Sequence, residues 1–282
     1  MKSISHGILF RIKPTKLLTY VFVLAMTLFF VTPMLYTFIS SLKPIDEIFE
    51  FPVRWIPRHI RLRNFIDPFV HHNFGIYLFN STFVAVSTTI SSLFLSSLAG
   101  YSLAKFNYRG RGLLFILVLM TMMLPIQVTM VPLAIIVRYL GMMNTYWGLI
   151  VPLMITPFAI FWMRQFILTI PNDYGDAARI DGLGEFGIFV RIIIPLCGPA
   201  LGALAIISFM SNWNSLVWPM IVASRDSLRT IPLGIVMFQG EFKVIWNEMF
   251  AMAIASTVPA LFFFLVLKNR LIQGLAMVGI KQ

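Results

Sequence analysis

The chain has 282 residues, of which 59% are hydrophobic and only 12% are charged, and its formal net charge is +11. A soluble domain carries about 25% charged residues because it needs a polar surface, so this composition excludes an ordinary soluble protein. The basic excess does not predict a nucleic-acid-binding face, because Lys and Arg are distributed among short segments along the chain. We interpret these residues as orientation signals and lipid head-group contacts.

Six stretches without any Asp, Glu, Lys or Arg divide the chain, and each is long enough to cross a bilayer. A helix needs roughly 20 apolar residues to span a hydrocarbon core of about 30 Å. Helices are expected rather than strands, because lipid leaves backbone polar groups without partners. The sequence therefore predicts an all-α, polytopic membrane protein with six transmembrane helices, at about 17–40, 75–100, 112–134, 142–163, 194–216 and 249–267.

Orientation follows from the basic residues. Lys and Arg are most frequent in the segments that lie inside when the N-terminus is cytoplasmic, as the positive-inside rule requires. This predicts a cytoplasmic tail at 1–16, a transmembrane domain at 17–267 with an inner loop at 164–191, and a second cytoplasmic tail at 268–282. The first apolar run is longer than a signal-peptide core, so we interpret it as an uncleaved helix.

Residues typical of catalysis or metal binding are scarce. Cys197 is the single cysteine, and His71 and His72 are adjacent rather than four residues apart, as a helical zinc pair requires. The sequence contains neither the P-loop pattern G-x-x-x-x-G-K-[ST] nor a G-x-S-x-G elbow. It predicts a non-enzymatic membrane subunit with no catalytic residue, no cofactor and no metal.

The stretch DAARIDGLGEFG, residues 176–187, contains the pattern G-x-G-x-x-G. In a Rossmann fold this pattern follows a strand, and an acidic residue about 20 positions later binds the ribose. Here it lies between two predicted spans and lacks that acidic residue, so a dinucleotide site is excluded. Instead, Pro171 and the possible N-cap Asn172 predict a short helix from Asn172 to Ile180. A small helix on such a loop is suited to a groove in a partner protein.

The same loop resembles the signature E-A-A-x3-G-x9-I-x-L-P of binding-protein-dependent ABC importer permeases. The corresponding residues here are Asp176, Ala177, Ala178, Gly182, Ile192, Ile194 and Pro195, with Asp176 in place of Glu and Ile194 in place of Leu. Segments at 79–112, 122–133, 141–150, 211–222 and 228–235 resemble the carbohydrate-uptake branch, most closely the smaller permease of the maltose and glycerol-phosphate type systems. Near the C-terminus, Gly274, Leu275 and Lys281 match the family's G-L-x-x-G-x-V-K-G ending, whereas Val278 and Gln282 depart from it.

The resemblance implies the type I ABC importer permease fold and a location in the inner membrane of a prokaryote. It implies a second permease chain as heterodimer partner, two ATP-binding subunits that hydrolyse ATP, and an extracytoplasmic solute-binding protein. The loop at 172–190 would be the coupling helix that docks on an ATPase subunit, through Asp176, Ala177, Ala178, Gly182, Ile192 and Pro195. The matching tail residues, Gly274, Leu275 and Lys281, would add a further contact.

Polar or aromatic residues in the predicted spans are candidates for the translocation pathway, namely Asn80, Ser81, Gln127, Asn212, Trp213 and Asn214. Amide side chains are costly in lipid, and Trp213 either stacks on a sugar ring or belongs to an interfacial belt. The Ser and Thr residues of the second span either line a polar route or mediate helix packing. The alternative function is a free-standing secondary transporter or channel for a small polar solute. Such proteins use intramembrane ionisable residues, and the predicted spans contain no Asp, Glu, Lys or Arg.

Overall fold

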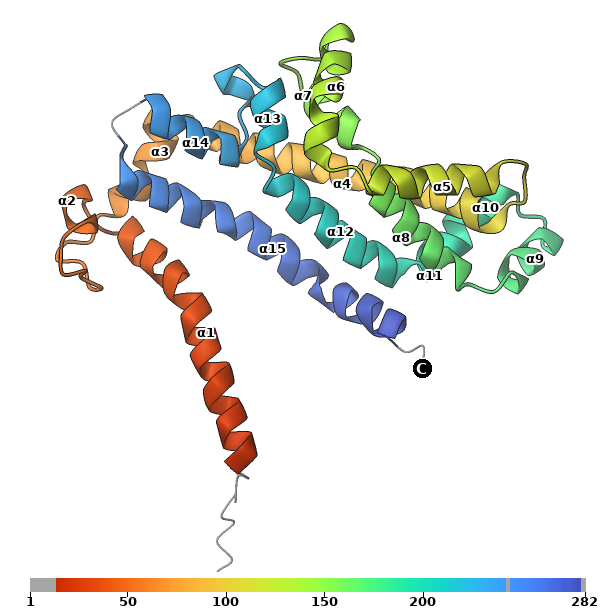
Figure 1. The fold of residues 1–282 in the computed structure, drawn as a ribbon, viewed down its shortest axis with the longest axis horizontal. Helices are drawn as coiled ribbons and strands as arrows, with labels where there is room; N and C mark the ends of the chain where they lie inside the picture. The colour runs from red at the N-terminus through yellow and green to blue at the C-terminus, as the bar shows by residue number, and fades with distance from the viewer. Residues whose placement is uncertain (1–13, 242–243, 280–282) are drawn as a thin grey trace, which may run out of the picture. The chain divides into compact units, whose positions relative to one another are not determined.

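A computed structural model describes residues 14–241 and 244–279 of the chain, and these residues form helices and turns without any strand (Figure 1). Most of the tail expected at 1–16 lies outside the described residues, as does Lys281. The prediction of an all-α protein is confirmed.

The helices are joined mostly by short connections, and residues 49–61 form a longer one without helix or strand. From the N-terminus they are α1 (Pro14–Ser41), α2 (Ile45–Ile48), η1 (Leu62–Phe65), α3 (Asp67–His71), α4 (Phe74–Lys105), α5 (Arg111–Met122), α6 (Ile126–Tyr139), α7 (Tyr146–Ile150), η2 (Val151–Leu153) and α8 (Pro157–Leu168). The chain continues with α9 (Asp173–Ile180), α10 (Glu185–Ile188), η3 (Phe189–Ile193), α11 (Ile194–Leu196), α12 (Gly198–Trp213), α13 (Val217–Val222), η4 (Asp226–Leu228), α14 (Ile231–Glu241) and α15 (Trp246–Gly279).

Three helices contain continuous stretches long and apolar enough to cross a membrane, at Lys16–Ser41, Phe74–Lys105 and Trp246–Lys268. Three further stretches each consist of two helices that meet at a bend. The bend is 106° between α5 and α6, 42° between α7–η2 and α8, and 79° at the start of α12. The described residues thus provide six candidate spans when each bent pair counts as one.

A proline lies at each of the three breaks, in segments where the sequence predicted one uninterrupted helix. Pro125 immediately precedes α6, Pro157 opens α8, and Pro195 and Pro199 flank the third bend. Proline has no backbone N–H and its ring clashes with the preceding turn, which favours a break at these positions. Pro33, Pro132 and Pro259 instead lie inside α1, α6 and α15, so proline alone does not determine where a helix ends. At α8 the new helix start is capped, because the Thr156 hydroxyl accepts a hydrogen bond from the helix backbone.

The chain divides into two units, Met1–Ile66 with Ile245–Ile254, and Asp67–Val244 with Ala255–Gln282. In the first unit the buried Asn64 side chain ties together segments that are distant in sequence. Its amide nitrogen donates to the carbonyl oxygens of Ser41 and Lys43 at 2.9 and 2.8 Å, and its oxygen accepts from Asn247 at 2.7 Å.

In the second unit α4 is the central helix and packs along both α8 and α12 (Figure 1). The α4–α8 contact is close because Gly100 has no side chain. A Cβ atom on Gly100 would lie 2.9 Å from the backbone nitrogen of Arg164. One buried apolar cluster surrounds the end of α4 that leads to Lys105 and includes Tyr101, Met163, Ile188 and Phe189. Residues of the loop that contains α9, such as Ala178, pack in this cluster.

Candidate functional site

Helix α9 spans Asp173–Ile180, close to the predicted 172–180, and ends in a Schellman motif. The N–H of Leu183 donates to the carbonyl of Ala178 at 2.9 Å, and the N–H of Gly182 donates to that of Arg179 at 3.0 Å. This motif needs a left-handed residue after the helix, and Gly182 has φ +83°. A Cβ atom on Gly182 would meet nothing within 4 Å, so the glycine is required by the backbone rather than by space.

Asn172 does not cap α9 with its side chain, contrary to the sequence-based expectation. It has helical backbone angles, and its side-chain oxygen accepts a hydrogen bond of 2.8 Å from Nζ of Lys105. The same ammonium group donates to the carbonyl oxygen of Ile170. The end of α4 therefore competes for the group that was expected to cap α9.

The two alanines of α9 face in different directions. Ala178 is 4% exposed and belongs to the buried cluster at the end of α4, whereas Ala177 is exposed. Tyr174 and Ile180 are also exposed, the latter to 88%. Of these two motif alanines, Ala177 therefore lies on the outer surface of α9 and Ala178 does not.

A hollow of about 430 Å³ lies against the outer side of α9. Its lining brings together three residues of the sequence motif, Ala177, Ala178 and Ile192. Asp173 and Asp181 border it at opposite ends of the helix. The hollow therefore presents small and apolar side chains with carboxylates beside them.

Asp176 belongs to a different arrangement, an ionic network centred on Arg179. The guanidinium group of Arg179 contacts Oδ1 of Asp176 at 2.6 Å and Oε1 of Glu185 at 2.7 Å, and Tyr101 Oη donates to Oε2 of Glu185 at 3.0 Å. Glu185 and Asp176 raise the pKa of Arg179, and the hydrogen bond to Glu185 is the largest cause. Sequence reasoning missed Arg179, Glu185 and Tyr101 as site residues, because their contacts join separate elements.

The last motif residue, Pro195, lies in α11 just before the 79° bend. Ile192 packs against the buried cluster at the end of α4 and also lines the hollow. The motif thus combines an exposed patch, a chain reversal and a helix bend. The structure brings Ala177, Ala178 and Ile192 together and leaves Pro195 outside the hollow.

Asn80, a pathway candidate, is 0% exposed and joins three segments of the second unit. Its amide nitrogen donates to the carbonyl oxygens of Ser227 and Arg229 at 3.0 and 2.9 Å. Its oxygen accepts a hydrogen bond of 2.6 Å from Tyr146 Oη. In this conformation both ends of the amide are occupied by the protein itself.

Ser81 is likewise buried, and its hydroxyl accepts a hydrogen bond of 2.7 Å from the N–H of Ile231 at the start of α14. Ser81 and Asn212 line one small cavity of about 10 Å³, which is room for roughly one water molecule. The space that Ser81 and Asn212 share is therefore too small for a sugar.

The remaining pathway candidates lie on α6 and at the end of α12, where Asn214 is the residue that follows the helix. Gln127 is exposed on α6. The amides of Asn212 and Asn214 donate to carbonyl oxygens four residues earlier, at 2.8 and 2.9 Å. Trp213 is buried and stacks on Phe209, with ring centroids 5.5 Å apart. The structure therefore does not gather the candidates around one polar opening.

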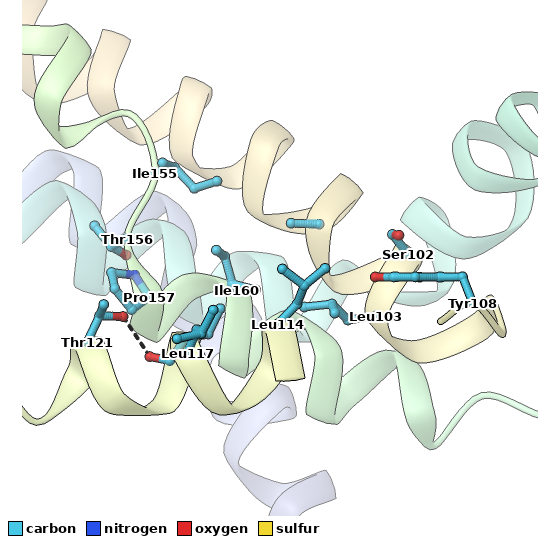
Figure 2. A pocket seen from close by; sticks show the side chains of 12 residues that line it. Ser102, Leu103, Tyr108, Leu114, Leu117, Thr121, Ile155, Thr156, Pro157 and Ile160 are labelled. Carbon is cyan, nitrogen blue, oxygen red and sulfur yellow. Dashed lines mark hydrogen bonds between the residues drawn. The ribbon is translucent and has the colours of Figure 1, made fainter. Parts of the chain in front are cut away.

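A second hollow, of about 470 Å³, lies between the end of α4 and helices α5 and α8 (Figure 2). Aliphatic side chains such as Leu114, Leu117 and Ile160 dominate its lining. Figure 2 shows the hydroxyl groups of Ser102 and Tyr108 at one end, and Thr121 bonding the backbone of its own helix. This apolar surface is suited to a lipid chain or another helix rather than to a sugar.

Neither metal binding nor cysteine chemistry finds support in the described part of the chain. No group of three His, Cys, Asp or Glu side chains there is arranged to hold a metal ion. Cys197 is buried as a free thiol.

The residues that match the family's C-terminal ending are only partly described. Gly274 and Leu275 fall within α15, and Lys281 lies outside the described residues.

Together these features define an all-helical, polytopic membrane protein with a compact helix on a loop between two bent helix pairs. The chain belongs to the family of binding-protein-dependent transport system inner membrane components, whose model matches residues 92–276. That range contains the whole loop at 164–191, so the family inferred from the motif is confirmed.

Several permeases are similar over most of their length. The arabinooligosaccharides transport system permease protein AraQ of Bacillus subtilis is 34% identical over 273 residues, covering 93% of this chain and 96% of that protein. The sulfoquinovosyl glycerol transport system permease protein SmoH of Agrobacterium fabrum is 31% identical, covering 88% of each. The sn-glycerol-3-phosphate transport system permease protein UgpE of Pectobacterium atrosepticum is 32% identical, covering 86% of this chain and 89% of that protein.

The fold also occurs in a solved structure. A chain in the crystal structure of a bacterial ABC transporter involved in the import of the acidic polysaccharide alginate has a TM-score of 0.81 and 21% sequence identity. The match covers 95% of this chain and 99% of that chain. The predicted ABC importer permease fold is therefore confirmed.

Proposed function

We propose that this chain is one permease subunit of an ATP-driven ABC importer and forms half of the translocation pathway for a sugar or sugar-like solute. Family membership supports the permease role. The solute class is supported by relatives named for arabinooligosaccharides, sulfoquinovosyl glycerol and sn-glycerol-3-phosphate. Each of these compounds carries more than one hydroxyl group.

The complete importer contains this chain, a second permease, two ATP-binding subunits and an extracytoplasmic solute-binding protein. Both termini and the loop at 164–191 lie on the cytoplasmic side of the inner membrane. ATP is hydrolysed in the separate subunits, which agrees with the lack of a P-loop in this sequence. Nucleotide and loaded binding protein act on the same equilibrium between inward-facing and outward-facing states.

The observation that carries the proposal is α9, a short helix whose exposed face carries Tyr174, Ala177 and Ile180. An exposed apolar side chain such as Ile180 on a loop helix favours contact with a partner. The hollow beside Ala177 offers space for a side chain of that partner. We assign this surface to docking on an ATP-binding subunit.

Co-purification tests the assembly. An ATP-binding subunit and a second permease should remain with this chain in mild detergent, and loaded binding protein should stimulate nucleotide hydrolysis by the complex. Purification as a single chain that transports solute without ATP would overturn the proposal and favour the secondary-transporter alternative.

Substitution of Ala177 by Asp tests the docking surface. The change places a charge on an exposed position, so the protein should insert normally while transport is uncoupled from ATP hydrolysis. Gly182→Asp should act in the same direction, but it also alters a left-handed position. Asn107→Asp is the control, since it adds the same charge at an exposed residue outside the loop and keeps an acceptor for Arg111. Wild-type uptake by Ala177→Asp at equal membrane levels would exclude the docking role.

A further inference from the structure

The last turn of α4 contacts both ends of the α9 segment. Tyr101 and Lys105 are four residues apart, so they lie on one face of α4. Lys105 bonds residues that precede α9, namely Ile170 and Asn172. Tyr101 bonds Glu185, which follows α9. Two residues of one helix turn therefore hold the segment at its beginning and at its end.

The contact after α9 is a relay through Glu185. One carboxylate oxygen of Glu185 accepts from Tyr101 Oη at 3.0 Å, and the other accepts from Nε of Arg179 at 2.7 Å. Arg179 also donates to Oε2 of Glu185 at 3.2 Å. This two-pronged contact between guanidinium and carboxylate fixes orientation as well as distance. Arg179 is on α9, so the relay joins α9 to α4 through side chains alone.

Packing restrains the α4 end of the relay. Tyr101 is 5% exposed, and its ring packs edge-to-face on Phe106 at 5.3 Å and near Phe189 at 5.5 Å. The phenol therefore moves with α4. Arg179 and Glu185 are about half exposed, so their ion pair by itself contributes little stability. The ion pair fixes the orientation of Arg179 relative to Glu185, although it adds little to the free energy of unfolding.

The space between the two contacts is open. A polar cavity of about 160 Å³ separates α9 from α4, with Tyr101, Lys105, Asn172, Asp176 and Arg179 in its lining. Polar side chains of α9 and α4 line this cavity, and Ala178 belongs to the same buried apolar cluster as Tyr101. A displacement of α9 is therefore opposed at two defined points of α4.

We propose that Tyr101 and Lys105 are positioning residues through which movement of the α9 loop reaches α4, with Glu185 as the relay on the Tyr101 side. The inference rests on the proposed function, in which an ATP-binding subunit moves α9. The backbone connects α9 only to α8 and α10. Through these side chains a movement of α9 also reaches a third helix, α4. That element is the central helix of the second unit.

The test uses the complete importer, reconstituted in lipid vesicles with its ATP-binding subunits and binding protein. Tyr101→Phe removes the hydroxyl and keeps the packed ring, Glu185→Gln removes the charge, and Lys105→Met removes the ammonium group. Solute uptake per ATP hydrolysed should fall about 5-fold or more in each variant, and further in Tyr101→Phe combined with Lys105→Met. Lys105→Arg should restore most of the uptake per ATP, because a cationic donor is retained.

Tyr108→Phe is the matched control, since Tyr108 lies close to the same end of α4 but outside these contacts. Co-purification of the ATP-binding subunit should be unchanged in every variant. Uptake per ATP equal to wild type would overturn the proposal, and so would loss of the ATP-binding subunit, because the residues would then act in docking. Failure of the wild-type chain to bind an ATP-binding subunit would instead refute the proposed function.

Discussion

Tyr146 Oη donates a hydrogen bond of 2.6 Å to Oδ1 of Asn80, a residue 66 positions earlier in the chain. The nitrogen of the same amide donates to Ser227 and Arg229 in the loop before α14. One buried side chain therefore joins α4, α7 and this loop. The arrangement explains how a polar residue is accommodated inside an apolar helix.

Replacing Asn80 by Leu should destabilise the subunit. The apolar side chain leaves two carbonyl oxygens and the Tyr146 hydroxyl without their partner, at about 1–3 kcal/mol for each group that stays buried. The midpoint of thermal unfolding in detergent, followed by size-exclusion chromatography, should fall clearly. Asn214→Ala is the control because that exposed amide bonds only its own helix. Equal midpoints for the two variants would contradict the assignment.

Gly100→Ala should separate α4 from α8. The added methyl group would lie 2.9 Å from both the Arg164 nitrogen and the Met163 Cβ, closer than van der Waals contact allows. Overpacking of this kind costs about 1–3 kcal/mol. Gly112→Ala adds the same methyl group at a helical position with nothing within 4 Å, and should leave the thermal midpoint unchanged or raise it. An unchanged thermal midpoint in Gly100→Ala would show that α4 and α8 move apart at little cost in free energy.

Gly182→Ala should loosen the end of α9, whereas Gly184→Ala should not. Gly182 has φ +83°, which costs an L-residue about 1–2 kcal/mol. Gly184 has φ −72° and open space around it, so alanine is compatible there. Limited trypsin digestion after Arg179 should be faster in Gly182→Ala than in Gly184→Ala. Identical digestion rates would mean that the Schellman motif does not hold the loop.

Replacing Ser92 or Ser96 by Ala should preserve both stability and transport. These hydroxyls are buried on α4, and the described part of the chain provides no hydrogen-bond partner for them. A buried hydroxyl without a partner is unfavourable, so its removal offsets the loss of contact. Thermal midpoint and the KM for uptake should both match wild type. A raised KM would place these serines on the solute route instead of in helix packing.

Ile180→Cys should report directly on the docking surface. Cys197 is the single cysteine of the chain and is fully buried, so it should not react with a maleimide in the folded protein. Ile180 is 88% exposed, and a cysteine there should be labelled in the isolated subunit and protected in the complex with the ATP-binding subunit. Tyr139→Cys, at a site 91% exposed outside the loop, should be labelled equally in both. Equal labelling of Ile180→Cys in both states would place the partner elsewhere.

The position of α9 was predictable because its signals are local. Pro171 stops the preceding helix, and Gly182 supplies the left-handed residue that ends the next one. The role of Asn172 was not predictable, since Lys105 comes from 67 positions away and takes the side chain that would otherwise cap the helix. Tyr101 and Glu185 were missed for the same reason. They are 84 positions apart, and the residues next to each one in the sequence do not indicate a contact between them.

The pathway candidates also show that a sequence does not reveal contacts between distant residues. Asn80 and Ser81 were selected because a polar side chain in an apolar span needs a partner, and that reasoning is correct. The partners are a loop and a neighbouring helix start of this chain. A sequence shows that a polar group must be satisfied, but not whether protein or solute satisfies it.

The sequence by itself determined the helical class, the approximate positions of the apolar segments and the family. Each depends on composition, spacing or a contiguous motif. The tertiary structure alone decided where three helices bend, which face of α9 remains exposed, and which side chains of α4 hold the α9 loop. These features depend on contacts between residues dozens of positions apart, and such contacts form only when the helices pack.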